Sequence, residues 1–216
     1  MDFENLRKRM VESQLVERGI KDERVLSVFL DTPRHEFIAP ELRRYSYEDR
    51  PLPIGSGQTI SQPYMAALMT ELLEVTEEMK VLELGTGSGY QTSILAALAR
   101  EVYSVERIAV LAENAAGTLD RLGIKNVHIK IADGSIGLKE FQPYDAIMVT
   151  AGAPRVPQAL LDQLRDGGRL VIPVGSRFSQ ELMCVQKKEG QLVETRSCGC
   201  VFVPLLGKQG WRVDNE

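Results

Sequence analysis

The sequence is poor in the residue types that build disulfide frameworks and zinc sites. Its 216 residues include only three cysteines, an odd number for a disulfide framework, and two histidines. With so few ligands available, no metal site is expected. Cys198 and Cys200 are interpreted as ordinary strand residues rather than a redox pair. Unpaired thiols are typical of a reducing compartment, so we expect a cytoplasmic protein.

Long apolar runs and basic clusters are also missing. No run approaches the roughly 18 apolar residues of a transmembrane helix, so no membrane partner is expected. Residues 1–5 lack the basic start and apolar centre of a signal peptide. The formal net charge is −4 and no Lys- or Arg-rich tail is present. We therefore expect no nucleic-acid partner.

Strands alternate with helices through the middle of the chain. Apolar runs of strand length stand between helical patterns, and a hairpin is predicted near the end. Alternation of this kind predicts a parallel sheet with helices wound on both faces, which the chain length allows as one α/β domain. The predicted strands cover residues 80–84, 101–106, 127–131, 144–149 and 169–174, and the hairpin covers 181–188 and the residues from 191 onward.

A glycine-rich stretch follows the first of these strands. Residues 81–90 read Val-Leu-Glu-Leu-Gly-Thr-Gly-Ser-Gly-Tyr, which predicts a buried strand, a tight turn and a helix start. Glycines permit positive φ and close approach of a ligand, and ligands of open α/β sheets bind at the carboxyl ends of strands. The G-x-G-x-G spacing differs from the dinucleotide pattern G-x-G-x-x-G. With Glu83 before the first glycine, it resembles motif I of S-adenosylmethionine-dependent methyltransferases; a turn without a ligand is the alternative.

Acidic residues end the next two strands. Glu106 stands 21 positions after Gly85, where nucleoside-binding α/β folds carry the acid that binds the ribose hydroxyls. A carboxylate accepts from both hydroxyls, although an acid at a helix start is the alternative role. Asp133, followed by Gly134, is predicted to accept a hydrogen bond from an adenine amino group.

A polar segment precedes an amphipathic helix before the glycine turn. Residues 58–65 read Gln-Thr-Ile-Ser-Gln-Pro-Tyr-Met, and apolar residues then recur at helical spacing. Ser61 falls where an N-cap belongs, and Pro63 is tolerated in a first turn. Free N–H groups at a helix start also suit a bound carboxylate, so Ser61 has two compatible roles. His35 is interpreted as structural.

Six segments together resemble the protein-L-isoaspartate O-methyltransferase family over essentially the whole chain. The segments are residues 58–65, 81–89, 143–147, 157–164, 167–175 and 202–205. The resemblance implies a doubly wound, mostly parallel, seven-stranded Rossmann-like methyltransferase sheet with an N-terminal helical extension. It implies methyl transfer from S-adenosylmethionine to the α-carboxylate of L-isoaspartyl residues in damaged proteins and peptides. S-adenosylhomocysteine is the product, and the methyl ester collapses to a succinimide, which starts repair.

The resemblance also assigns residues. Ser61 matches the catalytic serine. The residues matched to substrate binding are Thr59, Ile60, Gln62, Val203 and Leu206. The residues matched to cofactor binding are Gln58, Glu83, Gly85, Thr86, Gly87, Gly89, Glu106, Arg107, Asp133 and Gly134. Many relatives carry a polar residue at the position of Leu206, so this chain departs from the family pattern there.

The expected organisation is a single, monomeric domain. Residues 1–57 would form the N-terminal helical extension and loop, 58–206 the catalytic core, and 207–216 a loose C-terminal tail, of which Trp211 packs back onto the fold. The alternative function is a methyltransferase of the same fold acting on another small carboxylate. A non-catalytic nucleoside-binding module is a further alternative, but it has no need of residues 58–65.

Overall fold

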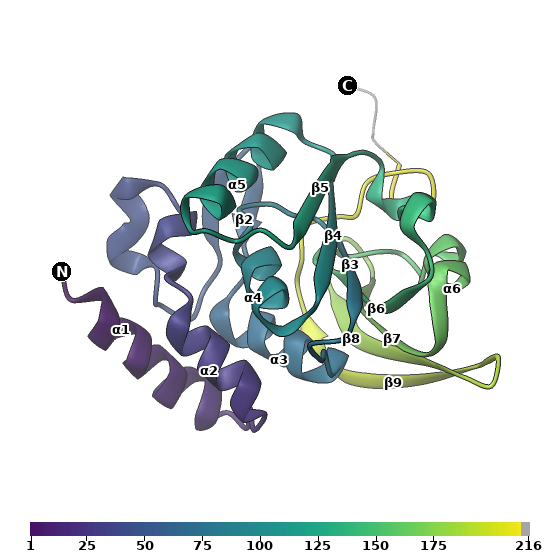
Figure 1. Cartoon of the computed structure of the whole chain (residues 1–216), viewed down its shortest axis with the longest axis horizontal. Helices are drawn as coiled ribbons and strands as arrows, with labels where there is room; N and C mark the ends of the chain where they lie inside the picture. The colour runs from purple at the N-terminus through teal and green to yellow at the C-terminus, as the bar shows by residue number, and fades with distance from the viewer. Residues whose placement is uncertain (213–216) are drawn as a thin grey trace.

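The computed structural model describes residues 1–212, and a seven-stranded sheet lies at its centre (Figure 1). The strand order is β5-β4-β3-β6-β7-β8-β9. The first five strands in this order are parallel, whereas β8 and β9 are antiparallel to their neighbours. The strands are β3 (Lys80–Leu84), β4 (Glu101–Glu106), β5 (Val127–Ile131), β6 (Tyr144–Val149), β7 (Leu164–Gly175), β8 (Gln180–Lys188) and β9 (Gln191–Cys200). The predicted mostly parallel sheet of seven strands is confirmed.

Helices cover both faces of this sheet. Successive residues of a strand point to opposite faces of the sheet. Val81 therefore packs among the buried apolar side chains that include α3 and α4, and Leu82 packs among those that include α6. Figure 1 shows α3, α4 and α5 on one side and α6 on the other. These helices are α3 (Pro63–Leu73), α4 (Tyr90–Leu98), α5 (Ala109–Arg121) and α6 (Gln158–Gln163), with short 3-10 turns at η4 (Gly134–Ile136) and η5 (Lys139–Phe141).

The N-terminal extension adds a further layer outside α3 and α4. Asp22 caps α2 by accepting the backbone N–H of Arg24 at 2.9 Å. Phe29 and Phe37 pack edge-on against Tyr90 of α4, with ring centroids 6.0 and 5.5 Å away. The extension contains α1 (Phe3–Met10), η1 (Val11–Val16), α2 (Glu23–Asp31), η2 (Arg34–Phe37) and η3 (Pro40–Tyr45).

Two predicted boundaries need correction. The loop expected at the end of residues 1–57 contains β1 (Leu52–Gly55), which pairs with β2 (Gln58–Ile60) in a small antiparallel hairpin. The strand predicted at residues 169–174 begins earlier, because Leu164 of β7 already pairs with Tyr144 of β6. The register then shifts before Ala146, so the Asp-Gly-Gly residues form an irregularity inside the strand.

The C-terminal segment is not loose over the residues that the structure describes. The backbone N–H of Lys208 donates to Asp133 Oδ2 at 2.9 Å, and that of Gln209 donates to Ser135 Oγ at 2.9 Å. Trp211 packs back as predicted, donating its indole N–H to the Gly152 carbonyl at 3.1 Å. The rest of the predicted tail, residues 213–216, lies outside the described residues. Within residues 1–212, no helix is long and apolar enough to cross a membrane.

Candidate active site

A cavity of about 860 Å³, counted out to its open mouth, lies at the carboxyl ends of β3, β4 and β6. Its size is ordinary for a small-molecule site. It is bounded by the β3–α4 turn, the end of β4, the β2–α3 segment and the chain after β9. The lining residues are Gln58, Thr59, Ile60, Ser61, Ala66, Gly85, Thr86, Gly87, Ser88, Tyr90, Gln91, Val105, Glu106, Arg107, Ile108, Gly134, Thr150, Ala151, Val203, Pro204, Leu205 and Leu206.

The turn after β3 requires glycine for two different reasons. Gly85 has a φ of +102°, and a Cβ there would lie 2.4 Å from Thr150 Oγ1. That hydroxyl donates to the Gly85 carbonyl at 2.7 Å, so the glycine allows β6 to approach the turn. Gly89 does not line the cavity. A Cβ there would lie 3.2 Å from the Ala115 Cβ, so Gly89 allows α5 to pack against the start of α4.

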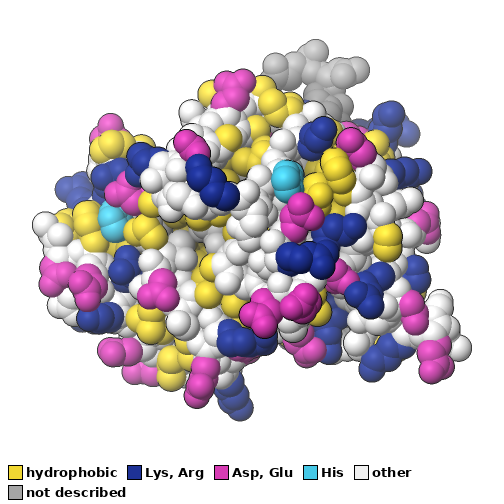
Figure 2. All heavy atoms as spheres, viewed as in Figure 1, with side chains coloured by type: hydrophobic (Ala, Val, Ile, Leu, Met, Phe, Trp, Pro, Cys, Tyr) yellow, Lys and Arg dark blue, Asp and Glu magenta, His cyan; other side chains and the backbone are white. Residues whose placement is uncertain are grey.

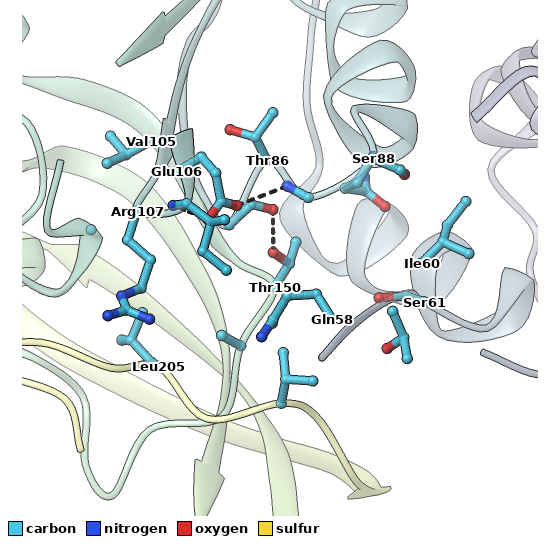
Figure 3. A pocket seen from close by; sticks show the side chains of 18 of the residues that line it. Gln58, Ile60, Ser61, Thr86, Ser88, Val105, Glu106, Arg107, Thr150 and Leu205 are labelled. Carbon is cyan, nitrogen blue, oxygen red and sulfur yellow. Dashed lines mark hydrogen bonds between the residues drawn. The ribbon is translucent and has the colours of Figure 1, made fainter. Parts of the chain in front are cut away.

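Glu106 presents its carboxylate at the cavity wall in a fixed orientation. Oε2 accepts the backbone N–H of Gly87 at 3.0 Å, and Oε1 accepts that of Ile108 at 2.9 Å. Each oxygen keeps a second lone pair, so the carboxylate can still accept from two neighbouring hydroxyls. Glu106 is therefore both the helix-start acid and a candidate ribose ligand (Figure 3).

Glu83 lies beneath the glycine turn and not on the cavity wall. It is 0% exposed, and its Oε2 accepts the hydroxyls of Thr92 at 2.5 Å and Ser104 at 2.6 Å. Ser104 Oγ is in turn 2.6 Å from Thr86 Oγ1, which reaches the cavity. Burial raises the pKa of Glu83 to about 7. Glu83 was predicted to contact the cofactor directly, but it is linked to the cavity only through Ser104 and Thr86.

Asp133 is also absent from the cavity wall, although Gly134 lines it. Its Oδ1 accepts the backbone N–H and the hydroxyl of Ser135 at 2.9 and 2.7 Å. Its Oδ2 accepts the Lys208 N–H. The carboxylate therefore fixes the C-terminal segment over the sheet, and the structure does not bring it to the place predicted for an adenine contact.

Ser61 lies on the opposite side of the cavity from Glu106. Figure 3 shows Ile60 and Ser61 on one side, with Glu106 and Arg107 on the other. The predicted capping role of Ser61 is wrong, because the N-cap residue of α3 is Gln62. The Gln62 side chain itself makes no capping hydrogen bond to the helix. Within residues 1–212 the Ser61 hydroxyl makes no hydrogen bond, which leaves it available to a ligand.

Asp49 performs the capping role instead. Its Oδ1 accepts the backbone N–H of Tyr64 at 3.2 Å, and its Oδ2 accepts the Gln62 amide at 2.7 Å and pairs with Arg18. Gln62 therefore turns away from the main cavity and lines an adjoining one. Because Pro63 has no N–H and that of Tyr64 is used, the start of α3 does not offer these groups to a carboxylate ligand.

Arg34 anchors the backbone of Ser61. This guanidinium is 0% exposed and lies 4.8 Å from the centre of the Tyr90 ring. It donates to the Ser61 carbonyl through Nη2 and to the Ser46 carbonyl through Nε, both at 2.7 Å. The sequence carries no local signal for Arg34 or Asp49, because their partners stand 12 to 31 positions away.

Most of the predicted site residues meet in this one cavity. Those that line it are Gln58, Thr59, Ile60, Ser61, Gly85, Thr86, Gly87, Glu106, Arg107, Gly134, Val203 and Leu206. Those that do not are Gln62, Glu83, Gly89 and Asp133. Sequence reasoning missed Ile108 and Thr150, although each directly follows a predicted ligand or strand end.

Metal ligands do not gather at this site. Within the described part of the chain, no group of three or more His, Cys, Asp or Glu side chains is placed to hold a metal ion. The thiols of Cys184, Cys198 and Cys200 are free. His35 stacks on Phe3 with ring centroids 4.0 Å apart, in agreement with a structural role.

Comparison with known proteins gives one family. A family model described as Protein-L-isoaspartate(D-aspartate) O-methyltransferase matches residues 5–210. A protein-L-isoaspartate O-methyltransferase of Geobacter metallireducens is 58% identical over 212 residues, covering 98% of each chain. Another, from Trichlorobacter lovleyi, is 53% identical over the full length of both chains.

Solved structures agree with this result. A structure described as a putative protein-L-isoaspartate O-methyltransferase from Plasmodium falciparum, in complex with S-adenosyl-L-homocysteine, is 30% identical with a TM-score of 0.80. The match covers 91% of this chain and 96% of that one. A second protein-L-isoaspartate O-methyltransferase is 34% identical, with a TM-score of 0.84, over 94% of this chain and 67% of the other. The chain belongs to the protein-L-isoaspartate(D-aspartate) O-methyltransferase family.

Proposed function

We propose that the two sides of the cavity divide the reaction of this family between them. The activity is methyl transfer from S-adenosylmethionine to L-isoaspartyl residues of damaged proteins, which initiates their repair. In our proposal the glycine turn and Glu106 bind the methyl donor, and Ser61 binds the carboxylate that receives the methyl group. The observation that carries this division is that one continuous cavity has Glu106 on one side and the unpaired Ser61 hydroxyl on the other.

The residues on the Glu106 side fit S-adenosylmethionine. The Glu106 carboxylate suits the two ribose hydroxyls, and the apolar side chains of Val105, Ile108 and Leu205 suit a purine face. The backbone of Gly85 and Gly87 leaves room for the methionine portion. When bound, this cofactor supplies a methyl group on a cationic sulfonium.

The Ser61 side needs to orient the acceptor rather than remove a proton from it. A substrate carboxylate has a reference pKa of about 3.5 to 4, so it is already ionised near neutral pH. Glu106 is the one carboxylate among the lining residues, and each of its oxygens already accepts a backbone N–H group, so we do not assign it the role of a general base. The Ser61 hydroxyl would donate to one carboxylate oxygen and direct the other toward the methyl group. Orientation of this kind contributes roughly 7 to 11 kcal/mol in well-positioned systems.

Methyl transfer from radiolabelled S-adenosylmethionine tests the proposed function. An isoaspartyl peptide is compared with the same peptide carrying normal aspartate, and label is expected only in the first. Equal labelling of both, or labelling of neither, would contradict the proposal. Labelling of an unrelated small carboxylate in place of the isoaspartyl peptide would favour the alternative function.

We further propose that the enzyme works as a cytoplasmic monomer on proteins and peptides, without nucleic-acid or membrane partners. The mild net charge of −4 supports this, as does the interspersion of basic and acidic side chains on the face shown in Figure 2. Light scattering after gel filtration measures the oligomeric state. Inhibition of peptide methylation by added RNA or anionic vesicles would contradict the proposed set of partners.

A further inference from the structure

A second cavity, of about 530 Å³, adjoins the first. It is bounded by residues before and within the start of α3 and by residues 199–203, which form the end of β9 and the chain after it. Thr59, Ser61, Thr150 and Val203 line both cavities, whereas Glu106 and the glycine turn line only the first. The second cavity thus reaches Ser61 without crossing the space proposed for the cofactor.

The wall of the second cavity carries no charged side chain. Its apolar part consists of Pro51, Met65, Val201, Phe202 and Val203. Its polar groups are hydroxyls, the Gln62 amide and the Cys200 thiol. Burial raises the pKa of Cys200 to about 12, so this thiol stays neutral near neutral pH. The amide of Gln62 is already bonded to Asp49.

A peptide held by its carboxylate at Ser61 must continue away from that point. The first cavity is taken by the cofactor in the proposed function, and the second one opens at the same serine. A side chain entering it meets apolar contacts and neutral hydroxyls. A charged side chain would lose water there without gaining an opposite charge, which is costly.

We propose that the second cavity is the subsite for a residue flanking the isoaspartyl residue, and that it selects uncharged, preferably apolar, side chains. The inference rests on the proposed function, because it takes Ser61 as the anchor of the substrate carboxylate. It adds a substrate preference that the cofactor site does not provide. The resulting substrate class is damaged sites with apolar neighbours.

Two series of isoaspartyl peptides test this subsite. One series places Val, Leu, Lys or Glu before the isoaspartyl residue, and the other places them after it. In at least one series, kcat/KM is expected to be about tenfold or more higher for Val and Leu than for Lys and Glu. Equal kcat/KM throughout both series would overturn the subsite alone. Absence of methylation of every isoaspartyl peptide would overturn the proposed function and the subsite with it.

A charge placed in the subsite gives a second, independent test. Val201 is 74% exposed, so Val201→Glu is expected to fold, and it adds a carboxylate to the cavity wall. The preference is expected to shift toward the Lys peptide by about tenfold in kcat/KM. Val193→Glu is the matched control, because Val193 is 49% exposed on β9 and does not line the cavity. Identical peptide preferences in the two variants would contradict the proposal.

Discussion

The two sides of the active-site cavity are held in place by different kinds of contact. On the proposed cofactor side, Gly85 and Gly87 directly follow β3 and Glu106 ends β4, two strands that are consecutive in the chain and paired in the sheet, and backbone N–H groups fix the carboxylate. On the acceptor side, Ser61 is positioned by Arg34 and its neighbours by Asp49, which come from the N-terminal extension.

This difference assigns separate tasks to separate parts of the chain. In the proposed function, the parallel strands and their turn preform the cofactor side, as in other α/β folds that bind a ligand at strand ends. The acceptor side depends on side chains far from it along the chain. Changes in the N-terminal extension should therefore affect the acceptor and leave cofactor binding intact.

The largest effect is expected from Ser61→Ala. Loss of the unpaired Ser61 hydroxyl, which faces the proposed acceptor, should lower kcat by roughly 100-fold, as for other single donors to a reacting oxygen. The dissociation constant for S-adenosylhomocysteine, measured by calorimetry, should stay unchanged because Ser61 lies opposite Glu106. Equal losses of turnover and cofactor affinity would remove the distinction between the two sides.

Glu106→Ala should produce the reverse pattern. The substitution removes both carboxylate oxygens from the cofactor side, so the calorimetric dissociation constant for S-adenosylhomocysteine should rise by about tenfold or more. Glu106→Gln keeps the shape and one acceptor oxygen and should show an intermediate loss. The peptide KM at saturating cofactor should not change. Unaltered cofactor affinity in Glu106→Ala would refute the ribose role.

Arg34→Lys tests whether the extension reaches the acceptor. Lysine keeps the charge but cannot bond to the Ser46 and Ser61 carbonyls with the same planar fork. We expect kcat/KM for the peptide to fall by about tenfold, with cofactor affinity unchanged. Arg24→Lys is the control, because Arg24 bonds to Asp22 and the Val75 carbonyl, away from Ser61. If Arg34→Lys weakened cofactor binding as much as peptide methylation, a positioning role would be excluded.

The smallest effect on activity is expected at Glu83, where stability changes instead. A folded-state pKa of about 7, above the usual 4.5, favours the protonated carboxyl in the folded protein. Its contribution to the free energy of unfolding is therefore complete below the unfolded-state pKa and is lost as the pH rises through about 7. The loss amounts to roughly 3 kcal/mol.

Glu83→Gln should remove that part of the pH dependence, because the amide is neutral throughout. Urea unfolding between about pH 5 and pH 8 compares the two proteins. The wild type should lose stability relative to the variant as the pH rises. Parallel stability curves would show that Glu83 does not titrate in this range.

The same contrast explains what the sequence could predict. The bounds of β4, β5 and β6 follow from local apolar patterns, and the glycine spacing places the cofactor turn. The sequence puts Glu83 and Asp133 near strand ends. It does not reveal that Glu83 is buried and accepts two hydroxyl groups, or that Asp133 accepts a backbone N–H of the C-terminal segment. Spacing alone also gives Ser61 a capping role, because the competing cap comes from the distant Asp49.

Asp49 has a consequence for how the enzyme responds to heat. One carboxylate joins Arg18 of the N-terminal layer to Gln62 and Tyr64 at the start of α3. Local opening of that layer would release the acceptor segment while the central sheet stays folded. On warming, methyl transfer should therefore cease before the cofactor dissociates, so the stability of the outer helices sets the upper working temperature.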